Sequence, residues 1–173
     1  MSTINHDLTK IKAFVFDIDG VLSGETIPLH PNGEPMRFAN TKDGYAMSTA
    51  ARQGFVLGII TGSNTEAVRR RYEGCGFKHI YQKSKRKLDD LHDFIQKTGL
   101  KLEDICYVGD DIPDSECLQA VGLPACPADA VPEIKAVSKY ISHKKGGEGV
   151  GRDIIEQVLK AQDKWPLTGN ASW

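Results

Sequence analysis

Short apolar runs alternate with helix-like segments along this chain, and this alternation limits the folds that it can adopt. The expected strands are 11–17, 55–60, 79–81 and 105–108, with short extended pieces at 124–126 and 140–142. The expected helices are 43–53, 64–73, 85–98, 113–121 and 149–161. Buried strands separated by helices of this length predict an α/β fold, a doubly wound parallel sheet with helices on both faces.

The length favours one domain. The chain has 173 residues, which lies within the usual range for a single folding unit. We expect this domain at 1–162 and a C-terminal tail without clear periodicity at 163–173. Residues 27–38 contain Asn32-Gly33, a strong hairpin turn signal, and three prolines that keep the hairpin short. The sequence therefore predicts a small β-hairpin insertion in the domain.

Composition excludes several classes of function. The net charge is −1, which gives no support to binding of nucleic acid or of an anionic membrane. No apolar run approaches the ~20 residues that span a bilayer, and the N-terminus lacks a signal-peptide core. The four cysteines form no C-x-x-C pair, so we expect reduced thiols rather than a zinc site. A cytoplasmic protein is expected.

Polar residues follow the expected strands where each one ends. In an open parallel sheet, ligands bind beyond the carboxyl ends of the strands. The residues at these ends are Asp17 and Asp19, Thr61, the lysines at 83, 85 and 87, and then Asp110, Asp111 and Asp114. Each one alone is explained as a turn or a helix cap. Together they predict a site at which carboxylates, a hydroxyl and an ammonium group meet.

The chemistry of these groups favours phosphoryl transfer. Crowded carboxylates are costly unless a cation neutralises them, and hard oxygen ligands without histidine or cysteine favour Mg²⁺. A nearby lysine adds positive charge for a phosphate. Asp17 is placed to act as a nucleophile. Gly20 lets the backbone turn away sharply, which leaves room for a phosphate. Asp19 would protonate the leaving oxygen and then activate water against an aspartyl-phosphate.

The motifs D-I-D-G-V, I-I-T-G, a lysine and G-D-D-x-x-D occur in the order that is typical of haloacid-dehalogenase-type phosphatases, and the chain resembles this superfamily over nearly its whole length. Within it, the chain resembles the small, cap-less 3-deoxy-D-manno-octulosonate 8-phosphate phosphatases. Segments 40–47 (NTKDGYAM), 108–116 (VGDDIPDSE) and 146–159 (GGEGVGRDIIEQVL) carry this resemblance. It implies Mg²⁺-dependent hydrolysis of that sugar acid phosphate, a step of lipopolysaccharide biosynthesis.

The resemblance also implies roles for individual residues, and it selects Lys87 from the three lysines. The expected catalytic residues are Asp17, Asp19, Thr61 and Lys87, with Asp114 in a supporting role. The expected metal ligands are Asp17, Asp19 through its main-chain carbonyl, and Asp110. The expected substrate contacts are Asp19, Asn40, Thr41, Lys42, Asp43, Gly44, Arg71 and Lys87.

Two positions depart from the family pattern. Ser63 stands where an arginine often follows T-G, and Glu148 replaces the arginine of a late G-G-R-G. G-G-E-G resembles relatives that act on 2-keto-3-deoxynononic acid 9-phosphate, so this sugar acid phosphate is the alternative substrate. Two more distant alternatives are a phospho-accepting signalling domain and a non-catalytic domain of the same fold.

The resemblance implies an assembly as well. Only the hairpin and one helix lie between Asp19 and Thr61, so no cap domain fits. Relatives of this type are homotetramers in which hairpins pair and neighbouring subunits cover each site. We therefore expect a homotetramer. The tail either reaches a neighbouring site or is a frayed terminus.

Overall fold

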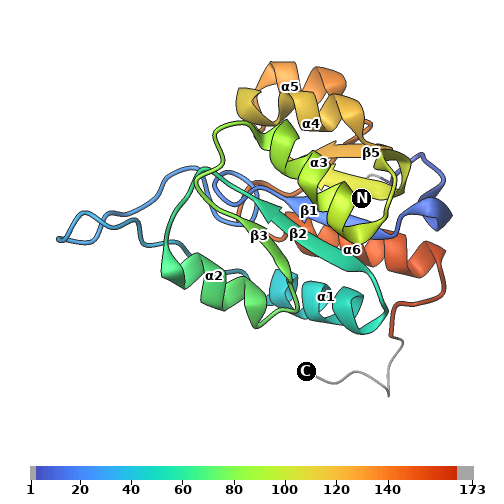
Figure 1. The fold of residues 1–173 in the computed structure, drawn as a ribbon, viewed down its shortest axis with the longest axis horizontal. Helices are drawn as coiled ribbons and strands as arrows, with labels where there is room; N and C mark the ends of the chain where they lie inside the picture. Colours follow the sequence, from blue (N-terminus) through green and yellow to red (C-terminus); the bar gives the residue numbers. More distant parts are fainter. Residues whose placement is uncertain (1–2, 167–173) are drawn as a thin grey trace.

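The computed structural model describes residues 3–166 and shows one parallel sheet between two layers of helices (Figure 1). The sheet has six strands in the order β3-β2-β1-β4-β5-β6. The strands are β1 (Ala13–Phe16), β2 (Val56–Ile60), β3 (His79–Tyr81), β4 (Ile105–Val108), β5 (Leu123–Cys126) and β6 (Tyr140–Ile141). This topology confirms the predicted doubly wound α/β fold.

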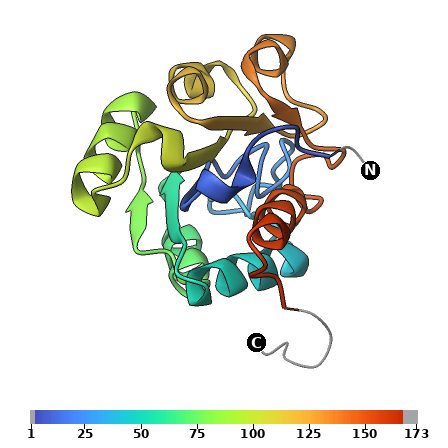
Figure 2. The ribbon, with the colours of Figure 1, turned by 90° about the vertical axis from the view of Figure 1, so that its right-hand side faces the viewer.

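Helices cover both faces of the sheet, as Figure 2 shows. The helices are α1 (Thr41–Arg52), α2 (Glu66–Glu73), α3 (Lys87–Thr98), α4 (Ser115–Ala120), α5 (Pro132–Val137) and α6 (Val150–Ala161). Three short 3-10 turns are η1 (Leu8–Lys10), η2 (Leu102–Asp104) and η3 (Ile112–Asp114).

Alternation along β1 divides the core between the two faces. Phe14 and Phe16 pack in one cluster with side chains of α1, α2 and α6. Ala13 and Val15 pack in a second cluster with side chains of α3, α4 and α5. All four residues of β1 are fully buried, because a parallel strand in the middle of such a sheet meets helices on both sides. The first strand therefore ends rigidly at the edge of the sheet.

Several helix boundaries differ from the prediction. Helix α1 begins at Thr41 because the side chain of Asn40 accepts hydrogen bonds from the first-turn amides of Lys42 and Asp43. Helix α3 begins at Lys87 rather than at residue 85. The helix expected at 113–121 is divided into η3 and α4, since the 3-10 turn ends at Asp114 and the α-helix starts after it.

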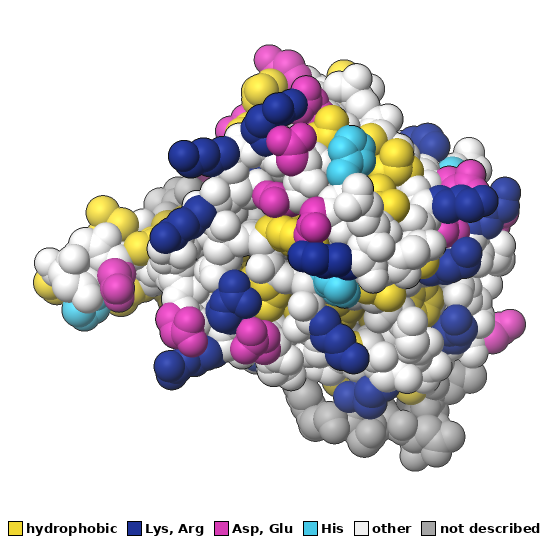
Figure 3. Space-filling model, viewed as in Figure 1, with side chains coloured by type: hydrophobic (Ala, Val, Ile, Leu, Met, Phe, Trp, Pro, Cys, Tyr) yellow, Lys and Arg dark blue, Asp and Glu magenta, His cyan; other side chains and the backbone are white. Residues whose placement is uncertain are grey.

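Residues 27–38 protrude from the body of the protein (Figure 1). A single antiparallel bridge joins Leu29 to Pro35, and Gly33 takes φ 87° at the tip. The insertion is thus a hairpin-like loop with one bridge instead of two regular strands. Leu29, Met36 and Phe38 are exposed on it, and Figure 3 shows hydrophobic side chains on its surface. No cap domain occurs among residues 3–166.

The tail begins after α6 and is described only as far as residue 166. Trp165 packs edge-on against Tyr45, with a ring-centroid distance of 6.0 Å, and the guanidinium of Arg152 lies 4.6 Å from the Trp165 ring centroid. The remainder of the tail lies outside the described residues, as does the prediction that it reaches a neighbouring site. Within the described part of the chain, no helix is long and apolar enough to cross a bilayer.

Candidate active site

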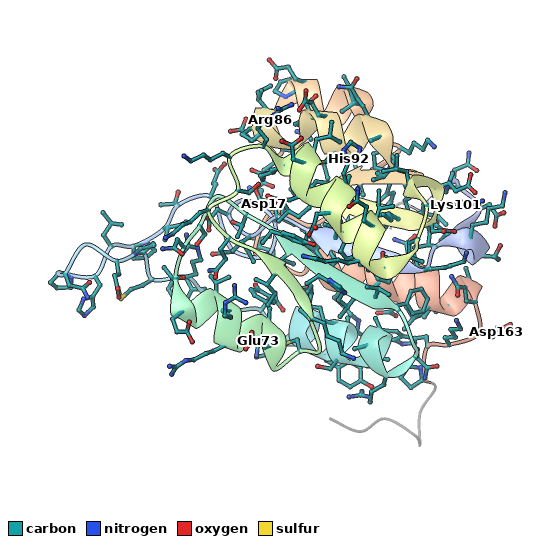
Figure 4. All side chains as sticks on the ribbon, in the orientation of Figure 1. Asp17, Glu73, Arg86, His92, Lys101 and Asp163 are labelled. Carbon is teal, nitrogen blue, oxygen red and sulfur yellow. The ribbon has the colours of Figure 1, made fainter. Side chains whose placement is uncertain are left out.

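Three carboxylates meet at the carboxyl edge of the sheet. Asp17 follows β1, Asp110 lies two residues after β4, and Asp114 ends η3. One carboxylate oxygen from each lies within 4.8 Å of the other two. Figure 4 shows Asp17 on the side of the sheet where α3 begins, near Arg86. The structure thus brings together the acidic residues that the sequence places far apart.

Lys87 joins two of these carboxylates. Its Nζ lies 2.7 Å from Oδ2 of Asp17 and 2.8 Å from Oδ1 of Asp114. The hydroxyl of Tyr107 donates to the same Asp114 oxygen at 2.7 Å, and the amide of Asp110 donates to the other at 3.3 Å. Asp114 is fully buried and its oxygens are occupied by these donors. It therefore positions the ammonium group beside Asp17, and its supporting role in catalysis stays a prediction.

Burial and mutual repulsion raise the pKa of two of these carboxyl groups, Asp17 and Asp110. Desolvation, followed by repulsion from Asp114 and Asp17, raises the pKa of Asp110 to about 8. Desolvation and repulsion from Asp114 raise the pKa of Asp17 to about 6, although Lys87 opposes the shift. Burial lowers the pKa of Lys87, but the carboxylates of Asp114 and Asp17 outweigh burial and raise it overall. The site has more negative charge than its lysine neutralises.

These residues fit a hard divalent cation. The three residues of the cluster are all carboxylates, and Mg²⁺ is held by oxygen ligands of this type. Gly20 takes φ +82°, and a Cβ atom there would lie only 1.9 Å from Oδ2 of Asp110. The glycine therefore leaves the space that the Asp110 carboxylate occupies. That Asp17, Asp110 and the main-chain carbonyl of Asp19 hold the ion stays a prediction.

Asp19 lies beside the cluster, and its carboxylate is paired with an arginine. Nε of Arg37 lies 2.6 Å from Oδ1 of Asp19, and Nη2 lies 2.8 Å from Oδ2. Sequence reasoning missed Arg37, which follows the hairpin and belongs to no recognisable motif. Nothing in the local pattern distinguishes it from a surface arginine.

Thr61 follows β2 and is buried. Its Oγ1 accepts a hydrogen bond from the amide of Ser63 at 3.1 Å, so the hydroxyl proton is left to donate to a phosphoryl oxygen. The Ser63 hydroxyl is buried and has no hydrogen-bond partner among the described residues. Binding of a phosphoryl oxygen by Thr61 stays a prediction.

The expected substrate contacts divide into buried and exposed residues. Asp43 is 3% exposed, and its Oδ1 accepts a short hydrogen bond of 2.6 Å from the amide of Arg152 at the start of α6. Desolvation raises the pKa of Asp43 to about 6, against the hydrogen bond from Arg152. Asn40 caps α1 and donates to the carbonyl of Gly147 at 3.1 Å. The side chains of Asn40 and Asp43 thus hold α1 against the segment that leads into α6.

Gly44 and Arg71, two more of the expected contacts, lie against each other. A Cβ atom on Gly44 would lie 2.4 Å from Nη2 of Arg71, so the buried glycine makes room for the guanidinium. Thr41 and Lys42 are exposed at the first turn of α1. Direct contact of these residues with substrate stays a prediction.

The carboxylates line a cavity of about 860 Å³. Lys87 lies in it, and Lys85, Arg86 and Glu25 also line its walls. The cavity is large enough for a sugar acid phosphate, because small-molecule sites commonly measure ≈ 300–1,000 Å³.

The chain belongs to the haloacid dehalogenase-like hydrolases, whose family model matches residues 64–154. Its relatives point to one group within this class. The 3-deoxy-D-manno-octulosonate 8-phosphate phosphatase of Salmonella typhi is 35% identical over 162 residues, which cover 92% of this chain and 86% of that protein. The enzyme of the same name from Escherichia coli strain K12 is 34% identical over 154 residues, 89% of this chain and 82% of that protein.

Solved structures agree with the sequence relatives. The 3-deoxy-D-manno-octulosonate 8-phosphate phosphatase of Moraxella catarrhalis, in complex with magnesium ion, phosphate ion and KDO, has a TM-score of 0.87 and 34% identity, covering 91% of this chain and 90% of that one. The structure of the Yersinia pestis enzyme of this name has a TM-score of 0.88 and 31% identity, covering 91% and 85%. These similarities confirm the predicted family and fold.

Proposed function

We propose that the protein is a Mg²⁺-dependent phosphatase that hydrolyses 3-deoxy-D-manno-octulosonate 8-phosphate to the free sugar acid and phosphate. One observation carries the proposal: the carboxylate of Asp17 lies 2.7 Å from the buried Lys87, and both residues line the cavity. A nucleophile beside a fixed cation is what transfer of a phosphoryl group requires. The names of the relatives supply the substrate.

The first half-reaction forms an aspartyl-phosphate. The Asp17 carboxylate attacks phosphorus, a bond from Asp17 oxygen to phosphorus forms, and the bond to the sugar oxygen breaks. Lys87 stabilises the charge on the phosphoryl oxygens, and the Thr61 hydroxyl donates a hydrogen bond to one of them. Asp19 gives its proton to the leaving sugar oxygen, which departs as the alcohol.

The second half-reaction restores the enzyme. Asp19, now ionised, takes a proton from a water molecule whose oxygen attacks phosphorus. The Asp17–phosphorus bond breaks, and phosphate and the free carboxylate result. Mg²⁺, when bound by Asp17, Asp110 and the carbonyl of Asp19, neutralises charge on the carboxylates and the phosphate.

The assembly we propose is a homotetramer in which the protruding hairpins pair. Leu29, Met36 and Phe38 are 69%, 45% and 78% exposed, which is costly for a hairpin surrounded only by water. Light scattering should give four times the monomer mass, and Phe38→Asp should lower it; a wild-type monomer would exclude the assembly. A cytoplasmic location also stays a proposal, and all four cysteines are free thiols, as in proteins of reducing compartments.

The decisive experiment compares two sugar acid phosphates. Phosphate release with Mg²⁺ is measured from 3-deoxy-D-manno-octulosonate 8-phosphate and 2-keto-3-deoxynononic acid 9-phosphate, with p-nitrophenyl phosphate as a control. We expect kcat/KM to favour the first by about tenfold or more, equivalent to ~1.4 kcal/mol. The reverse preference would assign Ser63 and Glu148 to nonulosonate recognition. Cleavage of p-nitrophenyl phosphate alone would support the phosphatase chemistry and would exclude both sugar acid phosphates as the substrate.

A further inference from the structure

The hydroxyl of Tyr107 reaches the reaction centre from inside the core. Tyr107 belongs to β4, where it pairs with Val15 of β1, and it is fully buried. Its phenol oxygen lies 2.7 Å from Oδ1 of Asp114. Burial and the negative charge of Asp114 raise the pKa of Tyr107 well above its ordinary value. The hydroxyl therefore keeps its proton and donates it to the Asp114 carboxylate.

Asp114 is fixed from several sides, and Lys87 follows its position. The amide of Asp110 donates to Oδ2 of Asp114 at 3.3 Å. A Cβ atom on Gly109 would lie 2.4 Å from both Cβ and Cγ of Asp114, so this glycine leaves the space that the side chain fills. Oδ1 is shared between Tyr107 and Nζ of Lys87, which lies 2.8 Å away. A lysine has a long, flexible stem, whereas the tyrosine donor sits on a buried strand.

The proposed reaction makes the contact between Lys87 and Asp114 more important as it proceeds. In the free enzyme, Nζ of Lys87 is paired with the carboxylates of Asp17 and Asp114. When Asp17 bonds to phosphorus, its carboxylate becomes an acyl phosphate and loses its own negative charge. Of these two partners, Asp114 alone then keeps its charge. The position of Lys87 during phosphoryl transfer therefore depends on Asp114.

We propose that Tyr107 is a positioning residue that fixes Asp114 and, through it, holds Lys87 against the transferring phosphoryl group. Stabilisation of the transition state requires charged groups that are in place before the reaction, and the Tyr107 hydroxyl supplies the rigid end of this chain of contacts. The inference rests on the proposed phosphatase chemistry, in which Lys87 stabilises charge on the phosphoryl oxygens.

Tyr107→Phe removes the hydroxyl and keeps the ring that packs in the core. Loss of a hydrogen bond that orients a ligand in a metal site costs about 10–100-fold, and we expect kcat with Mg²⁺ to fall about tenfold here. KM should change less than about threefold, because Lys87 acts mainly on charge that develops in the transition state. The loss should be equal for the sugar acid phosphate and for p-nitrophenyl phosphate, since both esters present the same phosphoryl group.

Competitive inhibition gives a readout that does not depend on the fraction of folded enzyme. Orthovanadate adopts the five-coordinate geometry of the transition state, whereas inorganic phosphate resembles the product. In Tyr107→Phe the Ki of orthovanadate should rise about tenfold and the Ki of phosphate less than about threefold. A role in stability alone would lower the amount of active enzyme and leave both Ki values unchanged.

Two further variants test how Tyr107 acts. Tyr140→Phe is the matched control, because Tyr140 is also buried and its hydroxyl donates to Oδ2 of Asp153 at the same distance, 2.7 Å. Asp153 lies on α6, outside the cavity that holds Asp17 and Lys87. Tyr140→Phe should leave kcat and both Ki values unchanged. Tyr107→Phe added to Asp114→Ala should cause no further loss of kcat, because the acceptor of the hydroxyl is already gone.

Several results would overturn the assignment. An unchanged kcat in Tyr107→Phe, or a fall in kcat with an unchanged Ki of orthovanadate, would refute it. Equal rises in the two Ki values would place Tyr107 in ground-state phosphate binding instead. Additive losses in the Asp114→Ala background, or the same losses in Tyr140→Phe, would also contradict it. Wild-type enzyme that releases phosphate from none of the esters would refute the proposed function, so the two failures are distinguishable.

Discussion

Replacing Gly20 by alanine should disable the metal site through one methyl group. The new Cβ would lie 1.9 Å from Oδ2 of Asp110, whereas ordinary contact begins at 3.4 Å, so the carboxylate would have to move by about 1.5 Å. Misplacement of a reacting group by ~1 Å costs about 10²-fold in rate, and disturbed support of a metal ligand costs ~10–100-fold in affinity. We expect Gly20→Ala to lose at least about 10²-fold in kcat and ~10-fold in Mg²⁺ affinity.

Gly54→Ala provides the matched control. Gly54 takes φ +86°, close to the φ +82° of Gly20, but a Cβ atom there would meet nothing within 4 Å. Both variants carry the cost of a left-handed backbone, about 1–2 kcal/mol, which lowers the Tm of a domain this size by ~2–8 °C. Only Gly20→Ala should also lose kcat and the Mg²⁺ affinity measured by calorimetry. Normal metal affinity in Gly20→Ala, or an equal loss in Gly54→Ala, would refute the reasoning.

Three other predictions concern the same cluster. Asp17→Asn should reduce steady-state turnover by ~10³-fold or more, because the nucleophile acts as part of a unit; turnover near the wild-type value would remove Asp17 from the mechanism. Lys87→Met should cost about 10²–10³-fold in kcat, as loss of one preorganised charge-stabilising group does, and an unchanged kcat would contradict it. Since the pKa of Asp110 is raised to about 8, Mg²⁺ must displace its proton, so the Kd from calorimetry should fall ~tenfold per unit between pH 6 and 8. A Kd that does not change with pH would exclude this coupling of metal binding to the Asp110 proton. The raised pKa also means that the metal-free folded state binds more protons than the unfolded chain, so its unfolding free energy should fall as the pH rises from 6 to 8.

The sequence predicts the acidic cluster because strand ends converge by topology. Asp17 and Asp110 directly follow buried apolar runs, and parallel strands deliver such residues to one edge whatever the details of packing. The choice among the lysines at 83, 85 and 87 was different, because all three follow the same strand. Helix α3 begins at Lys87, and this start places its side chain against Asp17 and Asp114.

Side chains that act through long-range packing were harder to predict. Arg37 follows the hairpin and reaches Asp19 across 18 positions of sequence, which no local periodicity encodes. Asp43 belongs to a motif that resembles a substrate loop, yet it is buried and bonds to an amide 109 positions away. A sequence motif predicts that such residues have a role, but it does not indicate which residue each of them contacts.

The charges of the site explain why its parts are needed together. When ionised, Asp17, Asp110 and Asp114 carry three negative charges, and Lys87 supplies one positive charge among them. Asp19 does not add to the excess of negative charge, because the positive charge of Arg37 pairs with its carboxylate. The remaining excess of two negative charges would repel a phosphate dianion in a buried site, and it matches the charge of one Mg²⁺ ion. Burial, followed by repulsion from Asp114 and Asp17, raises the pKa of Asp110 to about 8, so a proton relieves part of the excess in the metal-free protein. A divalent cation therefore does two things at once: it releases the proton and turns a cavity that repels phosphate into one that accepts it.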